Sequence, residues 1–262
     1  MPAIVYSPED IVSAGAARAL KEIVPFEEVE PAAGNRHFRH GELDLFELPK
    51  HHLYADHLDE LGADLLIVLS RHSSAQSVPA FTVHPMGNWS TEARLGGRPK
   101  DLATAAPVAM LRTLRALSEA DTNGLQVTYE ATHHGPFLNT PSFYAEVGGN
   151  ESTWTDRRLL AILAGSVHAS LTKEAPYEKV ALGIGGLHYE SKFARLALEG
   201  KYAFAHMMSK HYVREIDMLE KAATRSSPRP EVAVIEWKSL SSETRKPILA
   251  RLGEIGLDYV RV

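Results

Sequence analysis

Short apolar segments alternate with amphipathic segments along almost the whole chain. Apolar runs, continuous or alternating with polar residues, predict strands at residues 2–6, 64–70, 80–84, 125–132, 142–147, 179–184, 202–206, 231–237 and 257–262. Apolar positions at helical spacing predict helices at residues 7–21, 56–61, 100–119, 156–171, 191–198, 217–224 and 241–252, the first of them capped by Ser7. Residues 36–47 are expected to form a hairpin that turns at His40 and Gly41.

This alternation of strands and helices predicts an α/β fold, a three-layer sandwich with a mostly parallel mixed sheet. The strand at 64–70 is continuously apolar, which is typical of a strand covered on both faces. The chain has 262 residues, and we interpret residues 1–262 as a single domain. Residues 226–230, which are rich in serine and proline, are expected to form a linker. Open sheets of this kind bind ligands beyond the carboxyl ends of their strands.

Composition restricts where the protein works and what it binds. No apolar run approaches the length of a membrane span, and the first residues lack the charged and apolar regions of a signal peptide. We therefore expect a cytoplasmic protein with no membrane partner. The net charge of −5 argues against a protein that coats nucleic acid indiscriminately, and no DNA partner is expected. Because the chain has no cysteine, any metal must be held by histidine and carboxylate.

Four segments share one form, in which an apolar strand leads into a loop that contains histidine beside small or hydroxyl residues. They read S-R-H-S-S at 70–74, F-T-V-H-P-M-G-N at 81–88, Y-E-A-T-H-H-G-P at 129–136 and L-G-I-G-G-L-H-Y-E at 182–190. A single histidine at a strand end is commonly satisfied by the backbone, but four such loops can meet at one edge of a parallel sheet. Histidine titrates near neutral pH and is the commonest metal ligand, so this cluster suits either proton transfer or zinc.

Glu146 lies in the apolar strand at 142–147, where an unpaired carboxylate is costly to bury. It either faces solvent on an edge strand, or it orients a histidine, binds a metal or acts as a base. The candidate catalytic residues are therefore His72, His84, His133, His134, Glu146 and His188. The candidate metal ligands are His84, His133, His134, Glu146 and His188. Adjacent side chains on an extended backbone point in opposite directions, so only one of His133 and His134 is expected to be a ligand.

Other catalytic motifs are missing from the sequence. The glycines at 183, 185 and 186 lack the spacing of a dinucleotide-binding loop and the Lys-Ser/Thr pair of a P-loop, so no nucleotide cofactor is expected. No G-x-S-x-G elbow is present, which disfavours a serine nucleophile, and the H-E-x-x-H zinc helix is missing too.

Basic residues lie in or after the histidine loops. Isolated charges usually form a solvated face, but beside a catalytic edge they can hold the phosphates of an RNA acceptor arm without reading its sequence. The candidate RNA-binding residues are Arg71, Arg94, Arg98, Lys100, Lys192, Arg195, Lys201, Lys210 and Arg214.

Five linked motifs resemble those of the archaeal and plant type of D-aminoacyl-tRNA deacylase. They are S-R-H-S-S at 70–74, T-V-H-P-M-G-N at 82–88, T-H-H-G-P at 132–136, P-S-F-Y-A-E-V-G at 141–148 and G-I-G-G-L-H-Y at 183–189, in the family's order. The resemblance implies hydrolysis of the ester that joins a D-amino acid to tRNA, which removes D-amino acids from mischarged tRNA. It also implies a fold similar to peptidyl-tRNA hydrolases and nucleoside phosphorylases, and an association with zinc. The partner would be the acceptor end of D-aminoacyl-tRNA, held by the basic residues above, and we expect a monomer.

Two other functions fit the same residues. A zinc-dependent hydrolase could use the cluster on a small molecule or a nucleoside, and turnover without tRNA would distinguish it. A non-catalytic tRNA-binding module could stack its histidines on bases, and full affinity for tRNA without deacylation would distinguish that one. The resemblance favours the deacylase, in which a histidine, Glu146 or zinc activates water.

If the cluster carries the activity, replacing His133, His134 or His188 by alanine is expected to lower turnover of D-aminoacyl-tRNA at least about 100-fold, the scale of losing a general acid or base. His37 and His57 lie in less constrained surroundings, so the same replacement there is expected to have little effect. The assay follows release of tyrosine from D-tyrosyl-tRNA, with L-tyrosyl-tRNA as the control substrate. Equal losses in the two groups of variants would contradict the assignment.

Overall fold

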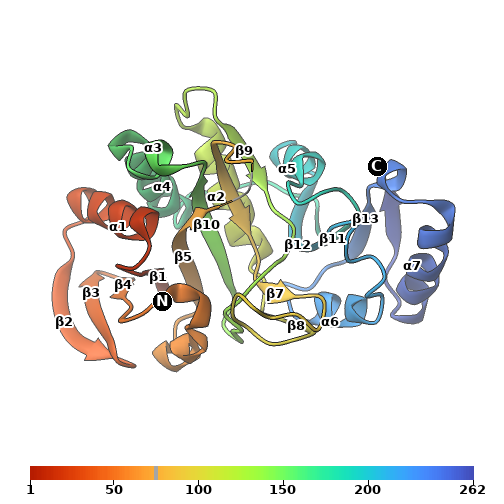
Figure 1. Cartoon of the computed structure of the whole chain (residues 1–262), viewed down its shortest axis with the longest axis horizontal. Coiled ribbons are helices and arrows are strands. Elements are labelled where there is room, and N and C mark those ends of the chain that lie inside the picture. The colour runs from red at the N-terminus through yellow and green to blue at the C-terminus, as the bar shows by residue number, and fades with distance from the viewer. Residues whose placement is uncertain (74–75) are drawn as a thin grey trace.

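The structure is a computed structural model that describes residues 1–73 and 76–262, so Ser74 at the end of the S-R-H-S-S motif lies outside the described residues. Most of the chain's strands form one large sheet (Figure 1). Its strands are β1 (Pro2–Tyr6), β2 (Glu27–Ala32), β3 (Asn35–His40), β4 (Leu43–Glu47), β5 (Leu65–His72), β6 (Ala80–His84), β9 (Gln126–Tyr129) and β10 (Ser142–Gly148). They are arranged in the order β2-β3-β4-β1-β5-β10-β6-β9.

Pairing in the large sheet is mixed, with parallel strands at its centre. β1 pairs in parallel with both β4 and β5, β5 pairs in parallel with β10, and β6 with β9. The β2–β3–β4 meander and the β10–β6 pair are antiparallel. The predicted α/β class with a mostly parallel mixed sheet is confirmed. The hairpin of β3 and β4 turns directly after His40, as expected, whereas β2 was not predicted.

The last parallel strands form a separate sheet instead of extending the first. It contains β11 (Lys179–Ile184), β12 (Tyr202–Met208), β13 (Val232–Ile235) and β14 (Tyr259–Arg261), all paired in parallel in the order β12-β11-β13-β14. A two-stranded ribbon consists of β7 (Gly87–Asn88) and β8 (Asp101–Leu102). One apolar cluster includes Phe143 of the large sheet and Phe204 of the small one, so the two sheets share a core. The single-domain interpretation stays a prediction.

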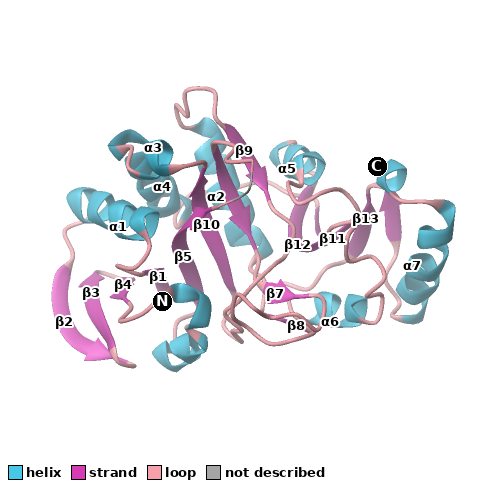
Figure 2. Cartoon of the chain, in the orientation of Figure 1, coloured by secondary structure: helices cyan, strands magenta, loops and turns pink. Residues whose placement is uncertain are grey.

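One face of the large sheet is covered by α-helices (Figure 2). The helices are α1 (Ile11–Ile23), α2 (Pro107–Glu119), α3 (Glu151–Trp154), α4 (Arg157–Ser170), α5 (Ser191–Leu198), α6 (Met218–Thr224) and α7 (Ser242–Glu254), with 3-10 helices η1 (His52–Tyr54), η2 (Asp56–Leu61) and η3 (Trp237–Ser239). α1, α2 and α4 share an apolar cluster with Phe143, Ala145 and Val147 of β10. Because neighbouring residues of a strand point to opposite faces, Tyr144 and Glu146 point away from these helices. No helix within the described residues is long and apolar enough to cross a membrane.

The first helix begins later than predicted because Asp10, rather than Ser7, is its cap. The carboxylate of Asp10 accepts a hydrogen bond from the backbone N–H of Ser13 at 2.8 Å. Asp10 is itself buried, so this cap also places a carboxylate in the interior of the protein.

The start of α2 and the segment at residues 226–230 also differ from the prediction, because backbone pairing involves residues there. α2 begins only at Pro107, since residues 101–102 pair with β7 instead of continuing the helix. Residues 226–230 do not form a free linker, because Ser226 is buried and bridges to Ala105.

His206 on β12 ties the small sheet to two other segments. Its buried ring lies 2.9 Å from the carbonyl oxygen of Arg225 and 3.1 Å from that of Ala103 through Nε2, which donates. Its Nδ1 lies 3.1 Å from the hydroxyl of Thr132, which can donate to it. Burial lowers the pKa of His206 to about 4 although the two carbonyl acceptors act in the opposite direction. The folded protein therefore holds this histidine neutral.

A neutral buried histidine makes stability depend on pH. His206 has an ordinary pKa of 6.5 and a folded pKa of about 4, so its stabilisation is complete above pH 6.5 and is lost as the pH falls toward 4. Over that range, the free energy of unfolding of the wild type should fall faster than that of His206→Gln, by at most about 1.4 kcal/mol per pH unit. Urea unfolding at several pH values measures both slopes. Parallel pH profiles for the two proteins would show that His206 is not held neutral.

Candidate active site

β10 places Glu146 on the face of the large sheet that points away from the helices, between β5 and β6. Two residues further along β10, Gly148 pairs with His72 at the end of β5. Two residues earlier, Tyr144 pairs with His84 at the end of β6. Because every second residue of a strand points to the same face, His72 and His84 flank Glu146.

The cluster does not sit at one edge of a parallel sheet, as the strand-end loops suggested. β5 runs parallel to β10 and β6 runs antiparallel to it, so the carboxyl ends of β5 and β6 point in opposite directions. The side chains therefore meet across a face of the sheet. The remaining candidate residues have to reach that face from loops that cross it.

The loops after β9 and β11 bring these residues into place. The backbone N–H of Ala131 donates to the carbonyl of His188 at 2.8 Å, which joins the two loops beside Glu130. His133 bridges to Met86, in the loop that follows β6. All six predicted catalytic side chains are thus brought to one place, together with Glu130, which was not predicted.

His133 and His134 face the same site. His134 has a φ of 44°, in the left-handed region, so the backbone here is not extended. The two rings lie 4.3 Å apart, and their centroids lie 4.2 and 5.0 Å from that of His84. The prediction that only one of them is a metal ligand assumed an extended backbone, and the observed backbone brings both rings to the site. The next residue is Gly135, where a Cβ would lie 2.1 Å from the backbone nitrogen of Gly97, so a larger residue would push these loops apart.

Glu130 and Glu146 are buried and surrounded by histidines. Oε2 of Glu130 lies 2.8 Å from Nε2 of His188 and 3.1 Å from Nδ1 of His72. Oε2 of Glu146 lies 3.6 Å from Nδ1 of His72 and 3.5 Å from Nε2 of His84. A buried charge is tolerated only with a partner, so these contacts are what allow two carboxylates in the interior.

The two carboxylates control the protonation of the histidines between them. Burial by itself would lower the pKa of His72, but Glu130 and Glu146 outweigh burial and raise that pKa to about 10. The pKa of His84 is also raised, because Glu146 outweighs burial there. Burial would raise the pKa of the two carboxyl groups, but the histidines hold both well below the usual range. Glu130 and Glu146 are therefore ionised and His72 is positively charged.

Three histidines are oriented by hydrogen bonds within their own loops. Each Nδ1 donates to a backbone carbonyl: His84 to Pro85 (3.1 Å), His133 to Ala131 (2.8 Å) and His134 to Gly135 (2.8 Å). Burial and the nearby His84 lower the pKa of His133, and they lower that of His134 to about 3, so both rings are neutral. A neutral ring that donates through Nδ1 has a free lone pair on Nε2. One ring nitrogen from each of the three histidines lies within 4.8 Å of the others.

Several buried polar atoms of the cluster have close neighbours but no hydrogen bond. Within the described part of the chain, this holds for Nε2 of His84, Oε2 of Glu146 and both carboxylate oxygens of Glu130. These ion-pair contacts are therefore close but lack the alignment of hydrogen bonds. Imidazole and carboxylate are ligands of divalent transition metals. The cluster could therefore bind a metal.

Tyr144 contacts the histidine cluster, and His52 contacts Tyr144. The ring of Tyr144 stacks on His84 with centroids 5.1 Å apart, and its hydroxyl donates to the carbonyl of Gly135 at 3.3 Å. Nδ1 of His52 lies 3.0 Å from the same hydroxyl, and Nε2 of His52 lies 3.6 Å from the carboxylate of Asp10. No sequence signal marked these residues, because the contacts join segments far apart in the chain.

The predicted RNA-binding residues fall into two groups. Six have acidic partners: Lys100 with Glu215 and Asp217, Lys192 with Glu236, Arg195 and Lys201 with Glu199, Arg71 with Asp10, and Arg94 with Glu92. The others are Arg98, Lys210 and Arg214. Arg94 and Arg98 flank Leu95, whose carbonyl accepts from the backbone N–H of Gly135 in the histidine loop. The backbone N–H of Lys210 donates to Gly186, in the loop that carries His188.

The fold and the cluster define an α/β enzyme with buried carboxylate–histidine pairs, a site suited to hydrolysis. The sequence profile of the D-aminoacyl-tRNA deacylase family matches residues 59–260. The chain is 37% identical over 261 residues to the D-aminoacyl-tRNA deacylase of Ignicoccus hospitalis, covering 99% of this chain and 98% of that protein. It is 36% identical over 275 residues to the D-aminoacyl-tRNA deacylase of Pyrococcus horikoshii, covering 100% of both.

A crystal structure described as a conserved protein of unknown function has a TM-score of 0.92 with this chain at 28% identity, covering 100% of this chain and 95% of that one. The chain belongs to the D-aminoacyl-tRNA deacylase family. Its activity is that of an ester hydrolase, the deacylation of D-aminoacyl-tRNA.

Removing the charge of Glu130 should destabilise the protein and change the titration of His72. In Glu130→Gln the charged His72 loses one of its two carboxylate partners, so its pKa should fall from about 10. Breaking a buried ion pair costs roughly 3–5 kcal/mol of unfolding free energy. NMR titration of the His72 ring and urea unfolding at pH 7 measure the two effects.

Glu28→Gln provides the control for this prediction. Glu28 pairs with Arg36 at the surface, where both side chains are 54% exposed, so its loss should cost less than about 1 kcal/mol. If Glu130→Gln were as mild as Glu28→Gln, the carboxylate would not be an ionised partner of the histidines.

Proposed function

We propose that the cluster hydrolyses the ester bond of D-aminoacyl-tRNA by means of a histidine–carboxylate pair beside a zinc ion. We infer this from the contact of 2.8 Å between Glu130 and His188, in which a fully buried carboxylate holds a histidine that is 43% exposed. Such a histidine can reach substrate while its ring orientation is fixed from inside the protein. The substrate class follows from the family, and the role of each residue follows from its position.

His188 exchanges protons with the reacting groups. Its Nε2 faces Glu130, which leaves Nδ1 to take a proton from the attacking water. The water oxygen bonds to the ester carbon, and the bond from that carbon to the ribose oxygen then breaks. His188 returns the proton to the ribose oxygen, giving a free D-amino acid and tRNA. Glu130 positions the ring and stabilises its charged form between the two steps.

The residues suited to hold zinc are His84, His133 and His134. A catalytic zinc takes three protein ligands and keeps one position open, and each of these rings has its Nδ1 held by a carbonyl so that Nε2 is the nitrogen that would bind metal. His133 and His134 are neutral, whereas the raised pKa of His84 means that its Nε2 would give up a proton on binding zinc. When bound, zinc supplies Lewis acidity toward the ester carbonyl and toward water. Glu146, 3.5 Å from Nε2 of His84, balances the added positive charge. Glu146 and His188, also candidate ligands from the sequence, remain next to the three histidines in this arrangement.

His72 keeps the carboxylates ionised. Its Nδ1 lies 3.1 Å from Glu130 and 3.6 Å from Glu146, and it is positively charged at neutral pH. Without this charge, one of two neighbouring buried carboxylates would take up a proton. His72 thus acts as a positioning residue for Glu130 and does not itself need to touch the substrate.

The acceptor end of tRNA approaches from the side of His133 and His134. A small hollow there is also lined by Asn88, Ser90 and Tyr212. The hollow is too small to hold a base, but an unpaired 3′ end can lie across its mouth and stack on an aromatic ring there. Of the predicted RNA-binding residues, Arg94 and Arg98 lie near Leu95 in the chain, Lys210 contacts the loop that carries His188, and Arg214 follows Tyr212 by two residues. These four residues bind phosphates in this proposal. Residues 1–262 act as one domain and as a monomer in the cytoplasm, where charged tRNA is used.

Zinc dependence is tested by metal analysis and chelation. Protein purified without added zinc should contain the metal, lose deacylation on treatment with a chelator, and regain it when zinc is restored. His134→Ala should bind less zinc, because it removes one of three ligands. His57→Ala, a histidine outside the cluster, should keep both metal and activity. Full activity in metal-free wild-type protein would show that Glu130 and His188 work without zinc.

A further inference from the structure

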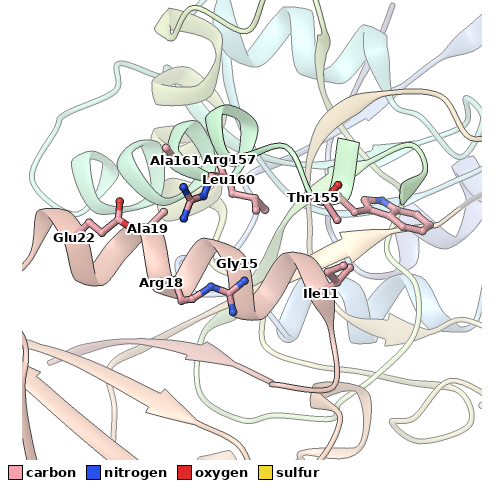
Figure 3. A pocket seen from close by; sticks show the side chains of 10 residues that line it. Ile11, Gly15, Arg18, Ala19, Glu22, Thr155, Arg157, Leu160 and Ala161 are labelled. Carbon is pink, nitrogen blue, oxygen red and sulfur yellow. The ribbon is translucent and has the colours of Figure 1, made fainter. Parts of the chain in front are cut away.

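A groove of about 350 Å³ lies between α1 and α4, apart from the histidine cluster (Figure 3). Its apolar lining includes Gly15, Ala19, Leu160 and Ala161, and Glu22 of α1 also lines it (Figure 3). The helices approach closely here, because a Cβ at Gly15 would lie 2.5 Å from Leu160 Cδ1. None of the reactions described above uses this groove.

Two arginines face the groove from opposite sides. Arg18 projects from α1 and Arg157 from α4 (Figure 3), and both are exposed. Within residues 1–73 and 76–262, neither makes an ion pair or a side-chain hydrogen bond. The adjacent Arg158 differs, because Asp121 binds it at 2.6 Å. Two unpaired guanidinium groups outnumber the one carboxylate of the lining, Glu22, and in a chain of net charge −5 they point to an anionic ligand.

Arg71 connects the groove to the active site. Its guanidinium lies 5.3 Å from the ring of Trp154, which lines the groove. Its Nε lies 3.5 Å from the carboxylate of Asp10 at the start of α1. The residue after Arg71 is His72, one of the buried histidines of the cluster. Arg71 thus lies between the groove and the end of β5, although the side chains of Arg71 and His72 point to opposite faces of the sheet.

We propose that this groove binds the sugar–phosphate backbone of the tRNA acceptor strand, with Arg18 and Arg157 on phosphates and Trp154 beneath a base. This inference rests on the proposed function, since it names a second contact of the same substrate. A guanidinium group can bind two phosphate oxygens at once, and aromatic rings stack on exposed bases whatever their sequence. The contact is remote from the ester, so it adds affinity for tRNA without changing the chemical step.

The test compares a long and a short substrate. For D-tyrosyl-tRNA at about 0.1 M salt, Arg18→Ala/Arg157→Ala should raise KM at least about tenfold and leave kcat unchanged. The slope of log affinity against log salt should fall by about 2, one for each lost phosphate contact. Hydrolysis of D-tyrosyl-adenosine, which lacks the acceptor strand, should be the same in variant and wild type.

Arg158→Ala is the matched control, because it removes the same charge from the same helix outside the groove. An unchanged KM and salt slope in the double variant would overturn the proposal, and so would an equal effect in Arg158→Ala. Binding of deacylated tRNA, measured at the same salt concentrations, gives the same comparison without any turnover. If the wild type hydrolysed neither substrate, the proposed function would fail, while the binding comparison would still decide the groove.

Discussion

Two ionised carboxylates close together in a protein interior repel each other, and each loses the stabilisation that water gives it. Glu130 and Glu146 can both stay charged because the positively charged His72 contacts both of them. This arrangement leaves Glu130 free to hold His188 and Glu146 free to balance charge near His84. The protonation of the surrounding histidines follows from it, and so does the site's capacity for a cation.

The alternation of side chains along β10 determines where this arrangement can exist. Residues 143, 145 and 147 enter the apolar cluster with α1, α2 and α4, and residues 144 and 146 point to the other face. The residues on either side of Glu146 in the chain therefore point into the helix-covered core, while Glu146 itself points to the other face. The same alternation places the ring of Tyr144 where it stacks on His84.

The sequence was informative where the signal is local. Apolar periodicity predicted most strands and helices, and histidines after strands marked the loops that form the site. Glu130 was missed although the same signal that marked Glu146, a carboxylate at the end of an apolar strand, was present in Y-E-A-T-H-H-G-P. The antiparallel direction of β6 and the separation of β11–β14 into a second sheet depend on pairing between distant segments. Local periodicity carries no information about such pairing, and the same holds for the contacts of His52 and Tyr144.

The hydrogen bonds that orient His84, His133 and His134 go to carbonyls no more than two residues away in the chain. The direction of each ring is thus a property of a short peptide segment, not of the sheet beneath it. Substitutions in the core can shift a whole loop slightly, but they do not rotate the histidine rings relative to the loop that carries them. Relatives with about a third of their residues in common could therefore retain one chemical geometry on differently packed interiors.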